Sequence, residues 1–403
     1  MTRASLCREV CCRLPLVALS LATLILLTAT PVGAQSPATG DVRGLTQSQQ
    51  QEPPPPQPPT PVAPQPPPAV EAERPKPEKP REALLLERGA ILLPMGSLQI
   101  EPSVEYARFS SNRVTISGFT LFNAIVIGTI EVDKIDLDIV TGALTARYGL
   151  LDRLQLEGRF PYVYRRDAEI LSVGTANQKE RTTTATDWGD VEASILGQAL
   201  IGNGAIPDVI LKLRGRFPTG THPFEIETER ITTGPGPGVT RLKEPPTGNG
   251  FYSVAPGVTL VWRSDPVIFF AGGNYAFNLE REFLRKNGAT SDFGKIDPGE
   301  TLELFFGLNI ALSERVSVNM SFVDSITKST KQTLPTDKEE KKVVGTSSND
   351  ARLILGTSIA LWTTDRWSGA LTVSAGAGLT RDSPDFQFTV ALPITCRNVF
   401  KLC

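Results

Sequence analysis

Apolar residues alternate with small or polar residues in many short segments of the last three quarters of the chain. In segment 299–312, Leu302 and Leu304 share one parity, whereas Thr301 and Glu303 share the other. Because successive side chains of a β-strand point to opposite faces, this period of two predicts strands with one apolar and one polar face. Twelve such segments follow one another: 97–109, 135–149, 153–166, 188–201, 207–218, 250–263, 267–279, 299–312, 315–327, 349–362, 367–380 and 384–395.

The connections between these segments alternate in length. The long ones are 110–134, 167–187, 219–249, 280–298 and 328–348, and the short ones are 150–152, 202–206, 264–266, 313–314 and 363–366. The last hairpin, 381–383, is short although it falls on the long side. Outer-membrane barrels have short periplasmic turns and long outer loops, and lipid permits only structures that satisfy their own backbone. The sequence therefore predicts an all-β fold: a single closed antiparallel transmembrane β-barrel of about twelve strands over residues 97–395, in the bacterial outer membrane.

One segment breaks the alternation. In 135–149 the apolar parity changes between Ile139 and Leu144. An extra residue in one strand shifts the faces of all residues after it, so we expect a β-bulge near Gly142.

Aromatic residues gather near the ends of the expected strands. Barrels place such residues at both membrane interfaces, although aromatic residues also favour strands in general. The candidates for these aromatic girdles are Tyr148, Phe160, Tyr162, Tyr164, Trp188, Trp262, Trp362 and Trp367.

The first 34 residues have the features of an export signal. Three arginines precede an apolar run from Leu14 to Thr30, and Val32, Gly33 and Ala34 form a small-residue exit. This order is typical of a secretory signal peptide cleaved before Gln35. The alternative is an uncleaved membrane anchor, for which the run is near the lower length limit.

Residues 35–81 are expected to form a disordered, proline-rich periplasmic spacer. Consecutive prolines fix φ and remove hydrogen-bond donors, which favours an extended polyproline II rod. The segment is either a passive linker or a spacer that contacts peptidoglycan or periplasmic proteins. Residues 82–96 then lead into the barrel.

Composition narrows the chemistry. The chain has 41 Lys plus Arg and 43 Asp plus Glu, so no strong positive charge is available to bind nucleic acid. Its single histidine, His222, excludes a multi-histidine metal site, and its cysteines lack paired zinc-binding spacing. We therefore expect no catalytic residues, metal or cofactor. A hydrolase that uses His222 with a nearby serine is the weakest alternative.

Two cysteines remain if the signal is removed, since Cys7, Cys11 and Cys12 lie within it. Cys396 and Cys403 are both in the tail of residues 396–403. Exported chains meet an oxidising compartment, so we expect a disulfide between them; two free thiols are the alternative.

The polar faces of the strands carry many charges. Lys212, Arg214 and Arg216 have one parity and would form a basic ladder. Acidic residues on neighbouring strands could pair with it, giving a structural interior, or the charges could line a pore that selects permeants. In the second case we expect a modest preference for anions. The pore-lining candidates are Lys212, Arg214, Arg216, Glu101, Glu105, Glu157, Arg159, Glu192 and Glu303.

Several motifs resemble an outer-membrane β-barrel family labelled MetA-pathway of phenol degradation, which is transporter-like. The resemblance covers roughly residues 90–395. It implies a channel or transporter for small, aromatic or apolar solutes, and the alternatives are a structural barrel linked to the cell wall by the spacer, or the hydrolase. The similar motifs are Leu92-Leu93-Pro94-Met95-Gly96, Ile100-Glu101-Pro102, Tyr148-Gly149-Leu150-Leu151-Asp152-Arg153, Phe160-Pro161-Tyr162, Asp187-Trp188-Gly189-Asp190 and Arg216-Phe217-Pro218-Thr219-Gly220.

Overall fold

The computed structural model describes the barrel and parts of its loops. The described residues are 92–110, 115–116, 119–120, 132–171, 179–203, 205–231, 239–283, 294–333, 339–343, 346–397 and 399. The expected signal peptide, the proline-rich spacer, the lead-in residues before 92 and Cys403 lie outside them. None of the described residues form a helix long and apolar enough to cross a membrane.

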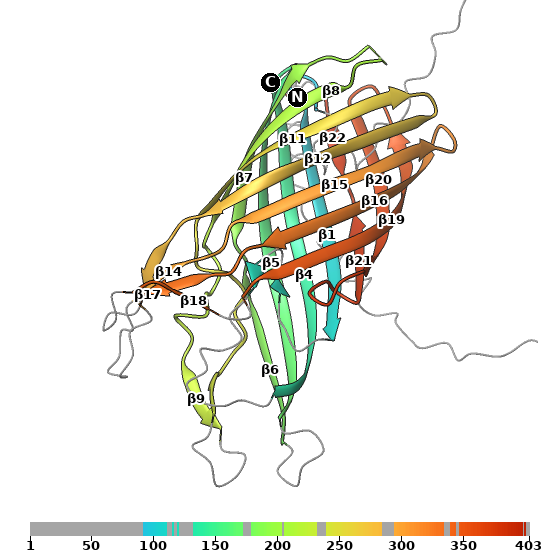
Figure 1. The fold of residues 1–403 in the computed structure, drawn as a ribbon. Helices are drawn as coiled ribbons and strands as arrows, with labels where there is room; N and C mark the ends of the chain where they lie inside the picture. The colour runs from blue at the N-terminus through green and yellow to red at the C-terminus, as the bar shows by residue number, and fades with distance from the viewer. Residues whose placement is uncertain are drawn as a thin grey trace, which may run out of the picture. The chain divides into compact units, whose positions relative to one another are not determined.

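The main sheet is antiparallel and closes on itself (Figure 1). Strand β19 pairs with β20, and β1 pairs with both β21 and β22, so the main path of the sheet closes into a barrel. Its strands are β1 (Leu98–Ser110), β4 (Val132–Leu151), β5 (Leu154–Leu171), β6 (Lys179–Trp188), β7 (Val191–Leu200), β8 (Asp208–Phe217), β11 (Ser253–Ser264), β12 (Val267–Asn278), β15 (Thr301–Ala311), β16 (Val316–Thr327), β19 (Ser348–Thr363), β20 (Trp367–Gly378), β21 (Phe386–Ala391) and β22 (Ile394–Cys396).

Two places around the barrel are each filled by two consecutive strands. Strands β6 and β7 both pair with β5, and they are separated only by Gly189 and Asp190. Strands β21 and β22 both pair with β1, and they are separated by Leu392 and Pro393. The fourteen strands of the sheet therefore occupy twelve places, which confirms the predicted barrel of about twelve strands.

The sorting of connections by length is also confirmed. Short turns join β4 to β5, β7 to β8, β11 to β12, β15 to β16 and β19 to β20 at one rim. We call this rim the short-turn end; β1 begins there and β22 ends there. The longer connections at the other rim contain β2 (Thr115–Ile116), β3 (Phe119–Thr120), β9 (Thr228–Ile231), β10 (Val239–Leu242), β13 (Arg281–Phe283), β14 (Gly294–Asp297), β17 (Lys331–Thr333) and β18 (Lys341–Lys342).

The outer surface of the barrel is apolar. Large hydrophobic side chains are exposed on every wall, for example Phe160 on β5, Leu213 on β8 and Phe306 on β15. Exposed Tyr162 and Trp188 make an edge-to-face contact with centroids 5.5 Å apart where β5 meets β6. In water such a surface would be unfavourable, whereas lipid accepts it. A closed barrel with this exterior is an outer-membrane barrel.

The expected bulge near Gly142 is wrong. Strand β4 pairs with β1 and with β5 without a register shift between Ile139 and Leu144. The apolar parity changes because the strand serves two apolar environments. Near the long-loop end, Leu137 and Ile139 point into the barrel and join a buried cluster with Phe109, whereas Leu144 points out toward lipid.

Candidate functional site: the barrel lumen

A cavity of about 390 Å³ lies inside the barrel. All nine charged residues that the alternation placed on the inner face line it: Glu101, Glu105, Glu157, Arg159, Glu192, Lys212, Arg214, Arg216 and Glu303. Ligand sites in proteins have volumes of roughly 300–1,000 Å³, so the cavity can hold a small solute together with water.

The basic ladder on β8 is largely paired. Lys212 Nζ lies 3.0 Å from Glu157 Oε1, and Arg216 Nη2 lies 2.9 Å from Glu192 Oε1. Arg214 comes no closer than 4.0 Å to the Glu192 carboxylate, so its ion pair is the longest of the three. The outer two members of the ladder therefore hold strands together, and Arg214 keeps donors directed at the cavity.

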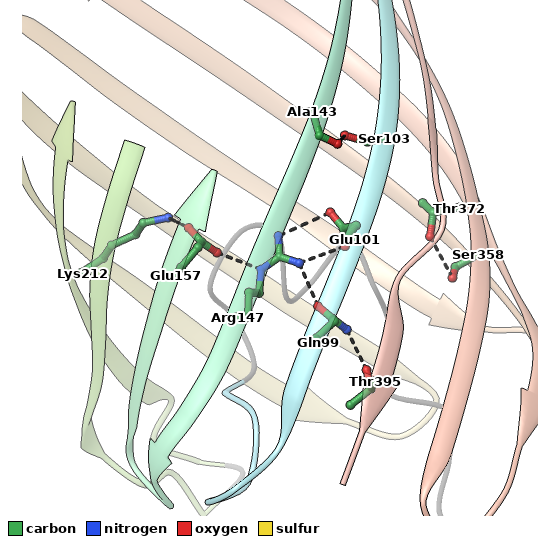
Figure 2. Close-up of polar contacts among 10 residues, drawn as sticks. All are labelled: Gln99, Glu101, Ser103, Ala143, Arg147, Glu157, Lys212, Ser358, Thr372 and Thr395. Atoms are coloured by element: carbon green, nitrogen blue, oxygen red, sulfur yellow. Dashed lines mark hydrogen bonds and ion pairs between the residues drawn. The ribbon is translucent and has the colours of Figure 1, made fainter. Parts of the chain in front are cut away.

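A polar network runs from strand to strand along the inner face of the wall near the short-turn end (Figure 2). Arg147 Nη1 donates to Gln99 Oε1 at 2.8 Å and to Glu101 Oε2 at 2.9 Å, while its Nε donates to Glu157 Oε2 at 2.8 Å. Only 2% of the Arg147 side chain is exposed. The network continues through Lys212, so one chain of ion pairs joins strands β1, β4, β5 and β8.

Positive and negative charges nearly balance around the cavity as a whole. Among the described lining residues, six are basic and seven are acidic. The basic ones are Arg147, Arg159, Lys212, Arg214, Arg216 and Arg352, and the acidic ones are Glu101, Glu105, Glu157, Asp190, Glu192, Glu303 and Asp350. Four of the six basic residues belong to β5 and β8, which flank β7. Any preference for anions must therefore arise at this wall and not from net charge.

The connection between β8 and β11 turns inward at the other end of the cavity. Residues 246–249 line the cavity together with the barrel strands. Asp190, at the break between β6 and β7, fixes this turn: its carboxylate accepts hydrogen bonds from the backbone N–H groups of Gly220 (3.2 Å) and Asn249 (3.0 Å). Arg165 Nη1 also donates to the Pro246 carbonyl at 3.2 Å. The long-loop end of the lumen is thereby narrowed by backbone.

Apolar side chains fill part of the lumen between the cavity and the short-turn end. Leu196, Ile210, Val261 and Phe270 come from four adjacent strands near the short-turn end, and Leu92 packs against this group from the lead-in segment. The complete buried cluster is Leu196, Ile210, Val261, Phe270, Phe305, Val323 and Ile354. We call this apolar cluster the floor of the cavity; the Arg147 network lies beside it, on strands β1, β4 and β5.

Sequence reasoning did not propose Arg147, Asn274 or Arg352 as lining residues. Arg147 lies on the strand whose change of apolar parity suggested a bulge, and this hid its inward direction. Asn274 accepts a hydrogen bond from Arg214 at 3.4 Å and donates one to Glu303 at 3.0 Å, so it links the basic wall to an acidic residue. Its parity with Gly272 and Asn278 on β12 is the signal that could have revealed it.

The remaining candidates lie away from the lumen. His222 Nε2 is 3.2 Å from Glu225 Oε1, and its ring packs against Phe224 and Phe283 in an outer connection. Cys396 is buried on β22, and its predicted disulfide partner lies outside the described residues, so the disulfide remains a prediction. Within the described part of the chain, no three His, Cys, Asp or Glu residues are grouped to hold a metal ion.

No family model matches the chain. Similar folds among solved structures include an outer membrane channel from Pseudomonas putida F1, at 12% identity and a TM-score of 0.47, covering 75% of this chain and 96% of that one. The translocator domain of the autotransporter NalP from Neisseria meningitidis has 11% identity and a TM-score of 0.42, covering 78% and 92%. The P. putida toluene transporter TodX has 9% identity and a TM-score of 0.33, covering 76% and 91%. At these values, the assignment of the barrel rests on its own strand pairing and apolar surface.

Proposed function

We propose that the protein is an outer-membrane channel for small solutes. The observation that carries this proposal is the cavity of about 390 Å³ inside a closed barrel, lined by charged and polar side chains. A barrel that served only as an anchor could fill its lumen with apolar side chains, as this one does below the cavity. Buried charge is costly unless it is paired or hydrated, and the donors of Arg214, which no close ion pair takes up, favour a hydrated or occupied space.

The lining favours solutes with both an apolar and a polar part. Arg159 and Arg214 face the cavity from β5 and β8, and both belong to the more basic wall. Phe109 and Val163 line the same cavity with apolar surface. We therefore infer that the channel admits small aromatic or apolar molecules that carry a polar or anionic group, in agreement with the family that the sequence resembles.

Uptake into proteoliposomes tests this function. The full mature chain should admit benzoate and phenol faster than a neutral sugar of larger size. Replacing Arg159 and Arg214 together by glutamine should slow benzoate more than phenol, because the guanidinium groups attract only the anion. Arg166→Gln is the matched control, because this half-exposed arginine is on the outer face of β5. Equal rates for vesicles with and without folded protein would contradict the proposal.

A structural role is the second candidate, and the ion-pair network favours it. Arg147, Glu101, Glu157 and Lys212 join four strands by hydrogen bonds of 2.8–3.0 Å, as expected of an interior built for rigidity. In that case the proline-rich sequence would link the barrel to the cell wall. Sedimentation of the mature protein with isolated peptidoglycan, compared with a chain lacking residues 35–81, would support this role if binding depends on the segment.

A further inference from the structure

The segment that leads into β1 enters the barrel before the strand begins. Leu93 is only 3% exposed, and its N–H donates to the Gln155 side chain at 2.9 Å. Gln155 is a fully buried, inward-facing residue of β5. Leu92 packs against the apolar floor of the lumen. Residues 92 and 93 therefore lie inside the barrel, at the opening of its short-turn end.

A tight turn carries the chain from this position into the barrel wall. The Ser97 N–H donates to the Pro94 carbonyl at 3.1 Å, and Gly96 has a φ of +72°, a conformation that favours glycine. Gly96 and Ser97 then exchange backbone hydrogen bonds of 2.8 and 2.9 Å with Gly149 of β4. The turn thus directs Leu92 and Leu93 inward while β1 leaves in the wall.

The adjacent strand β4 is shaped to receive this turn. A Cβ atom on Gly149 would lie 2.2 Å from the Pro94 carbonyl oxygen and 2.8 Å from that of Leu93. Both obstructing atoms are backbone, so a side chain at this position would force the lead-in segment to move. Elsewhere on the same strand, a Cβ on Gly142 would meet nothing closer than 3.9 Å.

We propose that Leu92 and Leu93 form a plug that closes the periplasmic mouth of the channel and opens it by withdrawal from the lumen. This inference rests on the proposed function, since it names the gate of that same lumen. The plug reaches the floor of the solute cavity from the short-turn end, where Leu92 packs against apolar side chains. It is held by packing and by one hydrogen bond to a side chain, and it precedes the first strand, so it can leave the lumen without unpairing a strand.

Two variants remove the plug by independent routes. Gly149→Ala obstructs the position of the lead-in backbone without changing the plug residues. Leu92→Asn with Leu93→Asn makes the plug polar without changing the strand that it packs against. Gly142→Ala and Met95→Asn are the matched controls, because Gly142 has open space and the Met95 side chain is 56% exposed. Heat-modifiable migration in gels shows that each refolded full-length mature chain forms a barrel.

The first readout is independent of transport. In a chain whose native cysteines are replaced by serine, Ser194→Cys places a thiol in the cavity just above the apolar floor. We expect both plug variants to increase the rate of its reaction with a charged maleimide at least several-fold, and the two controls to leave the rate unchanged. Unchanged labelling in both plug variants would overturn the proposal, whatever the conductance.

The second readout is the conductance of single barrels in planar bilayers. We expect the two plug variants to conduct more than the wild type and the controls. Faster labelling without any current in any variant would support the plug as a barrier and contradict the channel function. A current in the wild type that equals that of both plug variants, with unchanged labelling, would support the channel and overturn the plug.

Discussion

The two ends of the barrel are held together by different kinds of contact. At the short-turn end, Leu92 and Leu93 lie immediately before the first strand and close the mouth with two side chains. In the connections of the long-loop end, Phe224, Phe251 and Phe283 come from positions far apart in sequence and form a buried group, which we call the outer group. Phe224 stacks on Phe283 with centroids 4.1 Å apart, and both contact Phe251.

This difference indicates which end can open. The outer group is tied to its surroundings by two further contacts: Arg281 donates to the Gly250 carbonyl at 2.9 Å, and the Asp190 carboxylate accepts from the N–H of Asn249, two residues before Phe251. Moving it would expose several aromatic rings at once. The inner plug buries only two leucines and can leave without disturbing a strand. We therefore regard the long-loop end, which the anchored turn at 246–249 narrows, as fixed, and the short-turn end as the gate.

The largest loss of stability is expected from removing the positive charge of Arg147 near the short-turn end. Arg147→Met leaves Glu101 and Glu157 buried without their common partner, and breaking a buried ion pair in this way costs about 3–5 kcal/mol. Denaturant unfolding in lipid, followed by tryptophan fluorescence, measures the loss. The double variant Glu101→Gln with Arg147→Met should recover part of it. Arg108→Met, at a half-exposed arginine on the outer face, should cost little.

Truncating the outer aromatic group should affect only the long-loop end. Phe251 is fully buried, and Phe251→Ala should destabilise the group by about 3 kcal/mol, near the lower end for a buried phenylalanine. Hydrogen exchange should accelerate in residues 222–225 and 281–283, while the barrel strands keep their protection. Leu279→Ala, at a half-exposed residue of the same region, is the control. Exchange that accelerates throughout the barrel would contradict the view of the two ends as separate units.

Replacing the basic ladder should alter selectivity without unfolding the barrel. Lys212→Gln, Arg214→Gln and Arg216→Gln together leave Glu157 with Arg147, and they leave Glu192 with Arg159 as its nearest basic neighbour. The channel should then lose its modest preference for anions, as measured by reversal potentials in a salt gradient. Reversal potentials equal to those of the wild type would show that the ladder is purely structural.

Acidification should loosen the outer group slightly. Burial lowers the pKa of His222, an effect that Arg281 strengthens and the Glu225 carboxylate opposes. The unfolded connection therefore takes up a proton more readily than the folded one. Stability of the group is complete above the ordinary histidine pKa of about 6.5 and falls as the pH decreases toward the lower pKa of the folded state. Hydrogen exchange of residues 222–225, corrected for its intrinsic pH dependence, should show this change in the wild type and lose it in His222→Gln.

The sequence was sufficient to predict features that depend on local periodicity. Strands such as β15 and β16 face lipid on one side and the lumen on the other, so their alternation gives both their position and their inward residues. Strand β4 was harder, because its inward face is apolar near the long-loop end and charged at Arg147. The plug, the inward turn at 246–249 and the aromatic group could not be predicted, since each depends on contacts between residues that lie 26 to 62 positions apart.

Current through planar bilayers that contain the Gly149→Ala chain is the most direct test of the central claim, that the charged lumen is a conduit closed at its short-turn end. We expect discrete, ohmic current steps that are larger or more frequent than those of the wild type and of Gly142→Ala. Inserted, folded barrels of Gly149→Ala that pass no current at any voltage would contradict it.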